Sequence, residues 1–149
     1  DEVTYPLHVI LRFEIERDIF KGNLSVDDLP DAWNHKMKEL IGVTPPNNTL
    51  GVLQDVHWSM GGFGYFPTYA LGRLYSAQFA EQLSKDMPHW RADMAKGNCS
   101  PALEWSRKNI HSQGSIYRTE ELIEKVTGTP PSEEPFLNYL RAKYKKIFT

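Results

Sequence analysis

The sequence predicts an all-α fold, and two patterns carry this prediction. Apolar residues recur at three- and four-residue intervals, and no stretch shows the sustained two-residue alternation of a half-buried strand. Proline and glycine residues then divide the chain into about seven helical stretches. With 149 residues, of which 40% are hydrophobic and 24% charged, the chain has the composition of one ordinary folded domain.

The first half of the chain contains two predicted helices. The first covers residues 4–21, where Pro6 is tolerated because it falls in the first turn. Its apolar residues spread over most of the circumference, so we expect this helix to be largely buried. The second helix starts at Pro30 and stops at Gly42, and residues 44–49 form a loop.

The second half begins with a long helix, which Pro67 opens and which extends to about Lys85. Further helices are predicted over residues 87–95, 100–111, 119–128 and 132–148. The link at residues 129–132 is too short to separate domains. We therefore expect residues 1–149 to form a single helical region.

Composition and charge exclude several classes of function. The 17 basic and 19 acidic residues give a net charge of -2, so nothing indicates a nucleic acid or an anionic membrane as a partner. The longest apolar run, Val9 to Leu11, is far too short to span a bilayer. Cys99 is the only cysteine, which excludes an internal disulfide and indicates a reducing, cytoplasmic compartment. Peptide-like or other small ligands are favoured.

The densest group of functional side chains lies between Gly51 and Tyr69. Five of the ten glycines of the chain fall between Gly51 and Gly72, which indicates tight turns or a close approach of the backbone to another group. His57 and Tyr69 offer hydrogen-bond donors that can stabilise a negative oxygen as it forms. Asp55, two residues before His57, has the spacing to orient the imidazole, although this spacing alone does not require contact. Packing around a tight backbone is the structural alternative.

Two other sets of polar residues are weaker candidates. His8, Arg12 and Glu16 recur every four residues on one face of the first helix, either as a polar strip facing substrate or as a buried network of ion pairs. Arg73 follows Tyr69 by one helical turn, and it either binds Asp55 or a substrate carboxylate or lies in solvent. In both cases the structural alternative is the more common one.

Residues 51–58 closely resemble the signature G-x-x-Q-D-x-H-W of the carboxypeptidase Taq family of zinc metallocarboxypeptidases. Residues 1–16 resemble the family segment in which I-R-x-x-A-D leads into a Tyr-x-Leu-His helix, although only the terminal Asp of that motif is present, as Asp1. Residues 108–117 and 136–144 resemble the usual carboxyl-terminal helices of the family. The resemblance thus covers the whole chain, in the order of the last third of a family member.

The resemblance implies roles for individual residues. The family is similar in plan to the helical zinc peptidases that include angiotensin-converting enzyme and thimet oligopeptidase, in which a histidine followed by two tyrosines lies downstream of the metal ligands. The offset of twelve residues between His57 and Tyr69 favours Tyr69 as the transition-state donor. The implied catalytic residues are His57, Tyr65 and Tyr69, and the implied substrate-binding residues are Gln54, Asp55, Arg73, His8 and Arg12.

The chain departs from the family in its metal ligands. Zinc peptidases of this class use H-E-x-x-H, and no two of the five histidines here are four residues apart. We therefore expect no metal to be held by this chain alone, and zinc, or another divalent metal such as cobalt, in the full-length enzyme. The chain is then the carboxyl-terminal portion of an enzyme that removes single residues from peptide carboxyl ends, and it is inactive without its amino-terminal portion.

A non-enzymatic helical module, for assembly or peptide binding, is the alternative interpretation. An apolar first helix that lacks its usual cover exposes a surface able to pair with a second copy. A homodimer is therefore expected under either interpretation.

Overall fold

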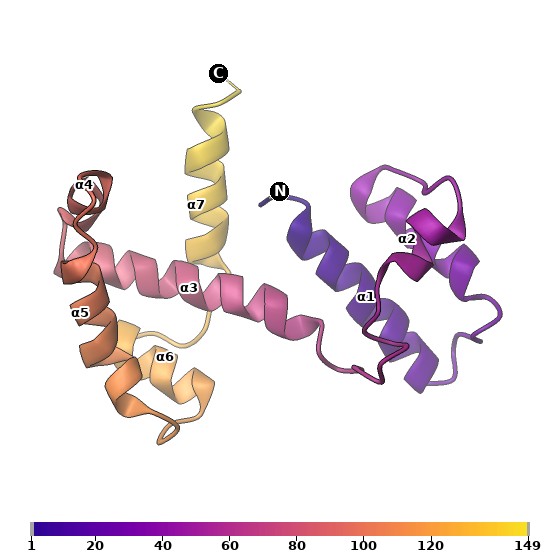
Figure 1. The fold of residues 1–149 in the computed structure, drawn as a ribbon, viewed down its shortest axis with the longest axis horizontal. Helices are drawn as coiled ribbons and strands as arrows, with labels where there is room; N and C mark the ends of the chain where they lie inside the picture. The colour runs from indigo at the N-terminus through magenta and orange to yellow at the C-terminus, as the bar shows by residue number, and fades with distance from the viewer. Residues whose placement is uncertain (1, 149) are drawn as a thin grey trace. The chain divides into compact units, whose positions relative to one another are not determined.

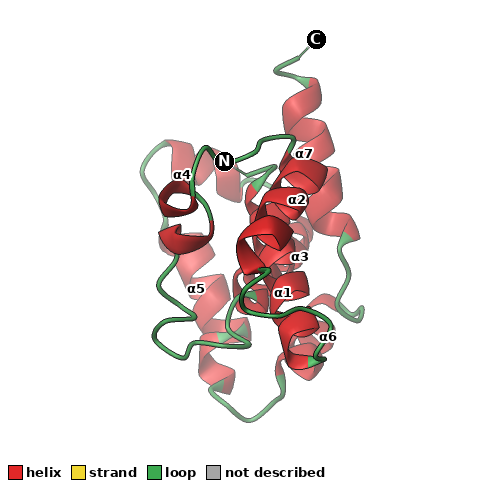
Figure 2. Ribbon diagram, turned by 90° about the vertical axis from the view of Figure 1, so that its right-hand side faces the viewer, coloured by secondary structure: helices red, strands yellow, loops and turns green. Residues whose placement is uncertain are grey.

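A computed structural model of the chain describes residues 2–148 and consists of helices and loops (Figure 2). Seven α-helices and three short 3₁₀-helices are present in this range, and it contains no strand. The predicted all-α fold is confirmed. The helices are α1 (Tyr5–Phe20), α2 (Leu29–Ile41), α3 (Pro67–Asp86), α4 (Trp90–Ala95), α5 (Ser100–Asn109), α6 (Thr119–Thr127) and α7 (Glu134–Lys145).

The chain divides into two compact units, a first unit that ends at Leu71 and a second unit that starts at Gly72. In the first unit α1 packs against α2 (Figure 1). Leu11 and Ile15, one helical turn apart on α1, are fully buried, and Trp33 of α2 is 3% exposed. These residues are the centre of the core that supports the segment between α2 and α3.

The prediction that α1 is largely buried is wrong for part of its circumference. Phe20 is 69% exposed and Phe13 is 44% exposed, whereas Val9, Leu11 and Ile15 are buried. One neighbouring helix covers only one side of an apolar cylinder, so the remaining apolar side chains of α1 stay exposed in the first unit.

The second unit contains a buried polar residue that joins α3 to the loop between α6 and α7. Gln78 is 3% exposed, and its amide nitrogen donates to Thr129 Oγ1 at 3.0 Å and to Pro130 O at 3.0 Å. Its amide oxygen accepts from the backbone N–H of Ser132 at 3.1 Å. The Gln78 side chain thus supplies hydrogen-bond partners for backbone groups of a proline-rich loop that lies outside any helix.

Four predicted helix boundaries differ from the observed ones by two or three residues. The helix predicted from Met87 starts at Trp90, because Pro88 disfavours the helical conformation of the residue before it. The helix predicted to reach His111 ends at Asn109 and is followed by a 3₁₀ turn. The last helix starts at Glu134 rather than at Ser132, whose hydroxyl oxygen accepts from the Glu134 N–H at 3.2 Å. It ends at Lys145 rather than at Phe148.

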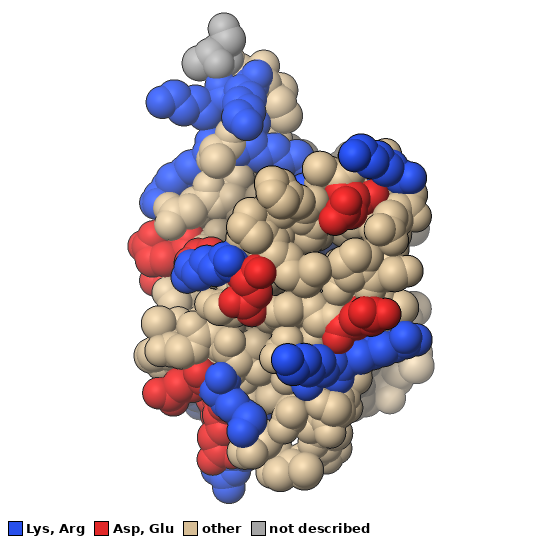
Figure 3. All heavy atoms as spheres, turned by 90° about the vertical axis from the view of Figure 1, so that its left-hand side faces the viewer, with Lys and Arg blue, Asp and Glu red and all other residues tan. Residues whose placement is uncertain are grey.

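Charged side chains of both signs are interspersed over the face drawn in Figure 3, and lysine and arginine gather toward the carboxyl-terminal end of the chain. The last turn of α7 carries Lys143 and Lys145, whereas its first turn carries Glu134. This order of charges favours the helix, because each end faces the opposite sign of the helix dipole. Within residues 2–148, no helix is both long and apolar enough to span a bilayer.

Candidate active site

The segment from Gly51 to Phe66 lies in the first unit and is anchored in its core. Val52 is 7% exposed and belongs to the same buried cluster as Leu11 and Ile15. Gly51 approaches Pro45 closely, since a Cβ atom at this position would lie 3.1 Å from Pro45 Cβ, which is tighter than ordinary van der Waals contact. The core therefore fixes the start of the segment.

Asp55 lies between an arginine and the candidate imidazole. Arg12 Nε donates to Asp55 Oδ2 at 3.0 Å, and the side chain of Arg12 is only 13% exposed. The other carboxylate oxygen, Oδ1, accepts from His57 Nδ1 and from the backbone N–H of His57 at 3.3 Å. Arg12 is itself held by His8, whose backbone carbonyl accepts from Arg12 Nη1 at 2.7 Å.

His57 brings the two candidate tyrosines together. Its Nε2 lies 3.2 Å from the Tyr69 hydroxyl oxygen. The Tyr65 ring stacks on the imidazole with centroids 5.7 Å apart and an interplanar angle of 22°, and Tyr65 and Tyr69 meet edge to face at 5.2 Å. All three residues predicted to be catalytic thus lie in one cluster. Tyr65 is 50% exposed and Tyr69 is 36% exposed, so both are accessible to a ligand.

The electrostatics of the cluster favour a charged Asp55 and a protonated Tyr69. Burial opposes ionisation of Asp55, but hydrogen bonds from His57 and the charge of Arg12 outweigh it and lower the pKa of this carboxyl. The pKa of Tyr69 is raised by desolvation first and then by Tyr65, Tyr5 and Asp55. The Asp55 carboxylate beside Nδ1 of His57 favours the tautomer with its hydrogen on Nδ1, and in that tautomer Nε2 is an acceptor for the Tyr69 hydroxyl proton.

Asp55 makes the stability of the chain dependent on acid. Its pKa is 3.8 in the unfolded chain and lower in the folded one, so the stabilisation is present above pH 3.8 and is lost as the pH falls through the folded pKa. We expect the wild type and Asp55→Asn to differ most in free energy of unfolding at neutral pH and to converge below pH 3.8. Urea unfolding at a series of pH values measures this difference.

His8 also makes the chain less stable as the pH falls, but over a separate range of pH. Burial and the nearby Arg12 charge lower its pKa from 6.5, so stability also declines as the pH falls below 6.5. This decline occurs in both the wild type and Asp55→Asn, so it cancels in the difference between their free energies of unfolding. A difference between wild type and Asp55→Asn that stays constant down to about pH 2 would contradict the assignment of the acid effect to Asp55.

The other predicted site residues are Gln54, Arg73 and His8. Gln54 ends a 3₁₀ turn over Val52–Gln54 and its side chain is exposed. Arg73 is half-buried on α3 and belongs to the second unit. The half-buried His8 contributes its backbone carbonyl to Arg12.

Phe66 was not among the predicted site residues, and Glu16 was predicted only as part of the polar strip on the first helix. Phe66 is 3% exposed, and its ring lies 4.7 Å from the imidazole of His57. Glu16 is 6% exposed, and its carboxylate accepts hydrogen bonds from Trp58 and Gly64. The four-residue spacing from Arg12 to Glu16 was the available signal, since both side chains lie on the face of α1 that meets the segment.

Among residues 2–148, no three His, Cys, Asp or Glu side chains lie close enough together to hold a metal ion. The described residues therefore do not fit a metal centre by themselves. The chemistry that they offer consists of hydrogen-bond donors and acceptors around His57.

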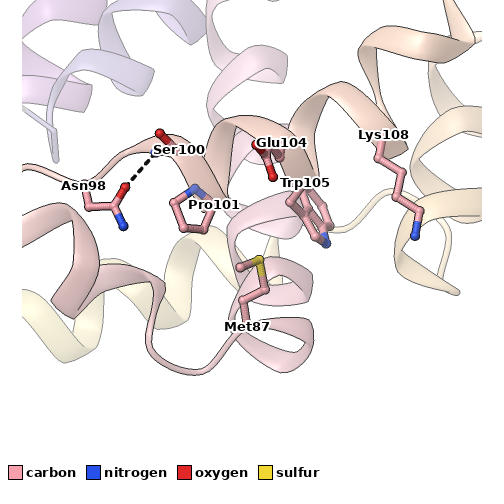
Figure 4. A pocket seen from close by; sticks show the side chains of 7 residues that line it. All are labelled: Met87, Asn98, Ser100, Pro101, Glu104, Trp105 and Lys108. Atoms are coloured by element: carbon pink, nitrogen blue, oxygen red, sulfur yellow. Dashed lines mark hydrogen bonds between the residues drawn. The ribbon is translucent and has the colours of Figure 1, made fainter.

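The second unit has a hollow of about 360 Å³ at the start of α5 (Figure 4). Its walls include the apolar side chains of Met87, Pro101 and Trp105, with Glu104 and Lys108 beside them. The indole nitrogen of Trp105 donates to Asp86 Oδ2 at 2.7 Å, which accounts for the polar atom of this wall. None of the predicted site residues lines this hollow.

The described residues are all-α, and one histidine and two accessible tyrosines cluster among them. The sequence profile described as Carboxypeptidase Taq (M32) metallopeptidase matches residues 1–144. The chain therefore belongs to this family, and the family resemblance inferred from residues 51–58 is confirmed.

Named relatives and solved structures agree with the family assignment. Thermostable carboxypeptidase 1 of Thermus thermophilus is 47% identical over 99% of this chain and 29% of its own length, and carboxypeptidase 1 of Bacillus subtilis is 40% identical over 99% and 30%. The crystal structure of M32 carboxypeptidase from Deinococcus radiodurans is 41% identical, with a TM-score of 0.94 over 98% of this chain and 30% of that one. The chain thus spans about 30% of the length of these relatives.

Proposed function

We propose that this chain is the carboxyl-terminal portion of a metallocarboxypeptidase and supplies one wall of the cleft in which peptides are bound. The full-length enzyme removes single residues from the carboxyl ends of peptides. Two findings support this assignment, namely the family match over residues 1–144 and the coverage of about 30% of relatives named as carboxypeptidases. Residues 1–149 act as a single helical region within the larger protein.

The observation that carries the proposal is the line of contacts from Arg12 through Asp55 and His57 to Tyr69. It leaves the Tyr69 phenol protonated and next to the exposed Tyr65 hydroxyl. When water attacks a peptide carbonyl, negative charge develops on its oxygen, and hydroxyl donors beside that oxygen lower the barrier. Tyr69 takes this role by turning its single hydroxyl proton from His57 Nε2 to the carbonyl oxygen, with Tyr65 and His57 beside it.

Arg12 and Asp55 have a different role from the substrate binding expected of them. The carboxylate oxygens of Asp55 are engaged by Arg12 and His57, so we assign Asp55 to fixing the tautomer and orientation of the imidazole. Gln54, Arg73 and His8 remain assigned to peptide binding.

The family implies a divalent metal, which we assign as zinc. Its ligands would come from the rest of the enzyme, and when bound it would supply the activation of the attacking water. This chain alone is accordingly inactive and needs the amino-terminal portion of the same enzyme.

We assign the enzyme to the cytoplasm as a homodimer. The thiol of Cys99 is free and exposed, which suits a reducing compartment. Exposed apolar side chains of α1 such as Phe13 and Phe20 suit burial in a larger assembly. The same exposed side chains also suit the alternative function, a non-enzymatic helical module that pairs with a second copy.

Peptide trimming distinguishes the two functions. We expect the full-length protein to shorten a peptide one residue at a time from its carboxyl end, as followed by mass spectrometry, and to lose this activity when a chelator removes the metal. The same peptide with a carboxyl-terminal amide is the control and should stay intact. A full-length protein that binds the free peptide but never shortens it would support the non-enzymatic module instead.

A further inference from the structure

Glu16 is a buried carboxylate that connects α1 to both ends of a glycine-rich turn. The side chain of Trp58 donates from Nε1 to Glu16 Oε2 at 3.1 Å, and the backbone N–H of Gly64 donates to Glu16 Oε1. Trp58 directly follows His57, and Gly64 directly precedes Tyr65. One side chain therefore holds the neighbours of two residues that we assign to the reaction.

The two hydrogen bonds explain why a carboxylate is present at this buried position. Desolvating a charged group is costly unless hydrogen bonds replace the lost water, and both oxygens of Glu16 accept from N–H donors. Both partners are donors only, so the site needs two acceptor atoms. A glutamine has the same shape but offers one acceptor, and its NH₂ group would face an N–H.

The turn between the two contacts depends on Glu16 for its closure. Gly61 and Gly64 have φ values of 76°, a conformation that side-chain-bearing residues rarely adopt, and Gly62 donates to His57 O at 2.7 Å. The turn folds back on His57 through this bond, and the Glu16 contact with Gly64 fixes where the chain leaves the turn. Tyr65 begins at that point and stacks on the imidazole at 5.7 Å.

We propose that Glu16 is a positioning residue for the reaction, holding Gly64 and Trp58 so that the Tyr65 phenol lies against His57. This inference rests on the proposed function of Tyr65 and His57. Glu16 is itself buried and touches no substrate. It acts through the backbone at Gly64 and the indole of Trp58.

The variant Glu16→Gln in the full-length, metal-loaded enzyme tests the proposal. We expect kcat to fall about ten-fold while KM changes less than about two-fold, because a misplaced Tyr65 affects the transition state more than peptide binding. In a Tyr65→Phe background the loss from Glu16→Gln should shrink to less than about three-fold, since the hydroxyl that Glu16 positions is already gone. A full ten-fold loss in that background would overturn the proposal.

Glu14→Gln is the matched control, because it changes the same charge on the same helix. Glu14 pairs with Lys36 at 2.6 Å and contacts neither the turn nor His57, so the kcat of Glu14→Gln should stay that of the wild type.

Crystal structures of the variants test the inference about Glu16 separately from the proposed function. Glu16→Gln should move the Tyr65 ring off His57 while the Arg12 contact with Asp55 is retained, and an unmoved ring overturns the inference whatever the activity. A Tyr65→Phe enzyme with wild-type kcat contradicts only the proposed role of the Tyr65 hydroxyl.

Discussion

In the full-length enzyme, Tyr69→Phe should lower kcat about 100-fold and leave KM within about three-fold of the wild-type value. The Tyr69 hydroxyl lies 3.2 Å from His57 Nε2, and desolvation and its neighbours raise its pKa, so it keeps its proton as a donor. Removing the hydroxyl deletes the donor that turns from His57 Nε2 to the carbonyl oxygen as charge develops there. Steady-state hydrolysis of an acylated dipeptide gives both constants.

Tyr117→Phe provides the matched control for this substitution. Its hydroxyl also makes one hydrogen bond, accepting from Lys125 Nζ at 3.0 Å, but it lies in the second unit outside the His57 cluster. We expect its kcat to equal that of the wild type. If Tyr69→Phe also retains wild-type turnover while Tyr65→Phe loses it, the transition-state donor is Tyr65 and the preference for Tyr69 is wrong.

Helix ends could be predicted where the covalent structure of one residue determines its own backbone conformation. Pro67 opens α3, and Gly42 ends α2 with a φ of 82° that most side chains do not tolerate. The start of α4 was misplaced because Pro88 restricts the residue before it rather than itself. The exposed part of α1 was not predicted for another reason. The spacing of apolar residues does not show which neighbouring helix, if any, packs against each face of α1.

The candidate site was predictable only in its local part. His57, Tyr65 and Tyr69 fall within thirteen positions of one another, so the motif alone placed them in one segment. Their partners come from far away in the sequence, Arg12 being 43 positions from Asp55 and Glu16 being 48 positions from Gly64. Periodicity put both side chains on one face of a helix, but only packing decides that this face meets the glycine-rich turn.

Asp55→Asn should lower kcat about 100-fold by reversing the tautomer of His57. Arg12 offers donors only, so the single amide oxygen of the asparagine faces Arg12 Nε and the NH₂ group faces His57 Nδ1. Nδ1 must then accept a proton rather than donate one, and Nε2 carries the hydrogen. Nε2 then donates to the Tyr69 oxygen, and the Tyr69 hydroxyl loses the acceptor that aligned it.

Nitrogen NMR of the histidine ring distinguishes this explanation from a general loss of structure. The wild type should show protonated Nδ1 at His57, and Asp55→Asn should show protonated Nε2 with the peptide KM within about three-fold of wild type. Asp86→Asn is the matched control, because Asp86 also accepts from ring and amide nitrogens but lies in the second unit. A low kcat with Nδ1 still protonated would mean that Asp55 acts on the substrate and not through the imidazole, which would restore the substrate-binding role predicted for it from the sequence.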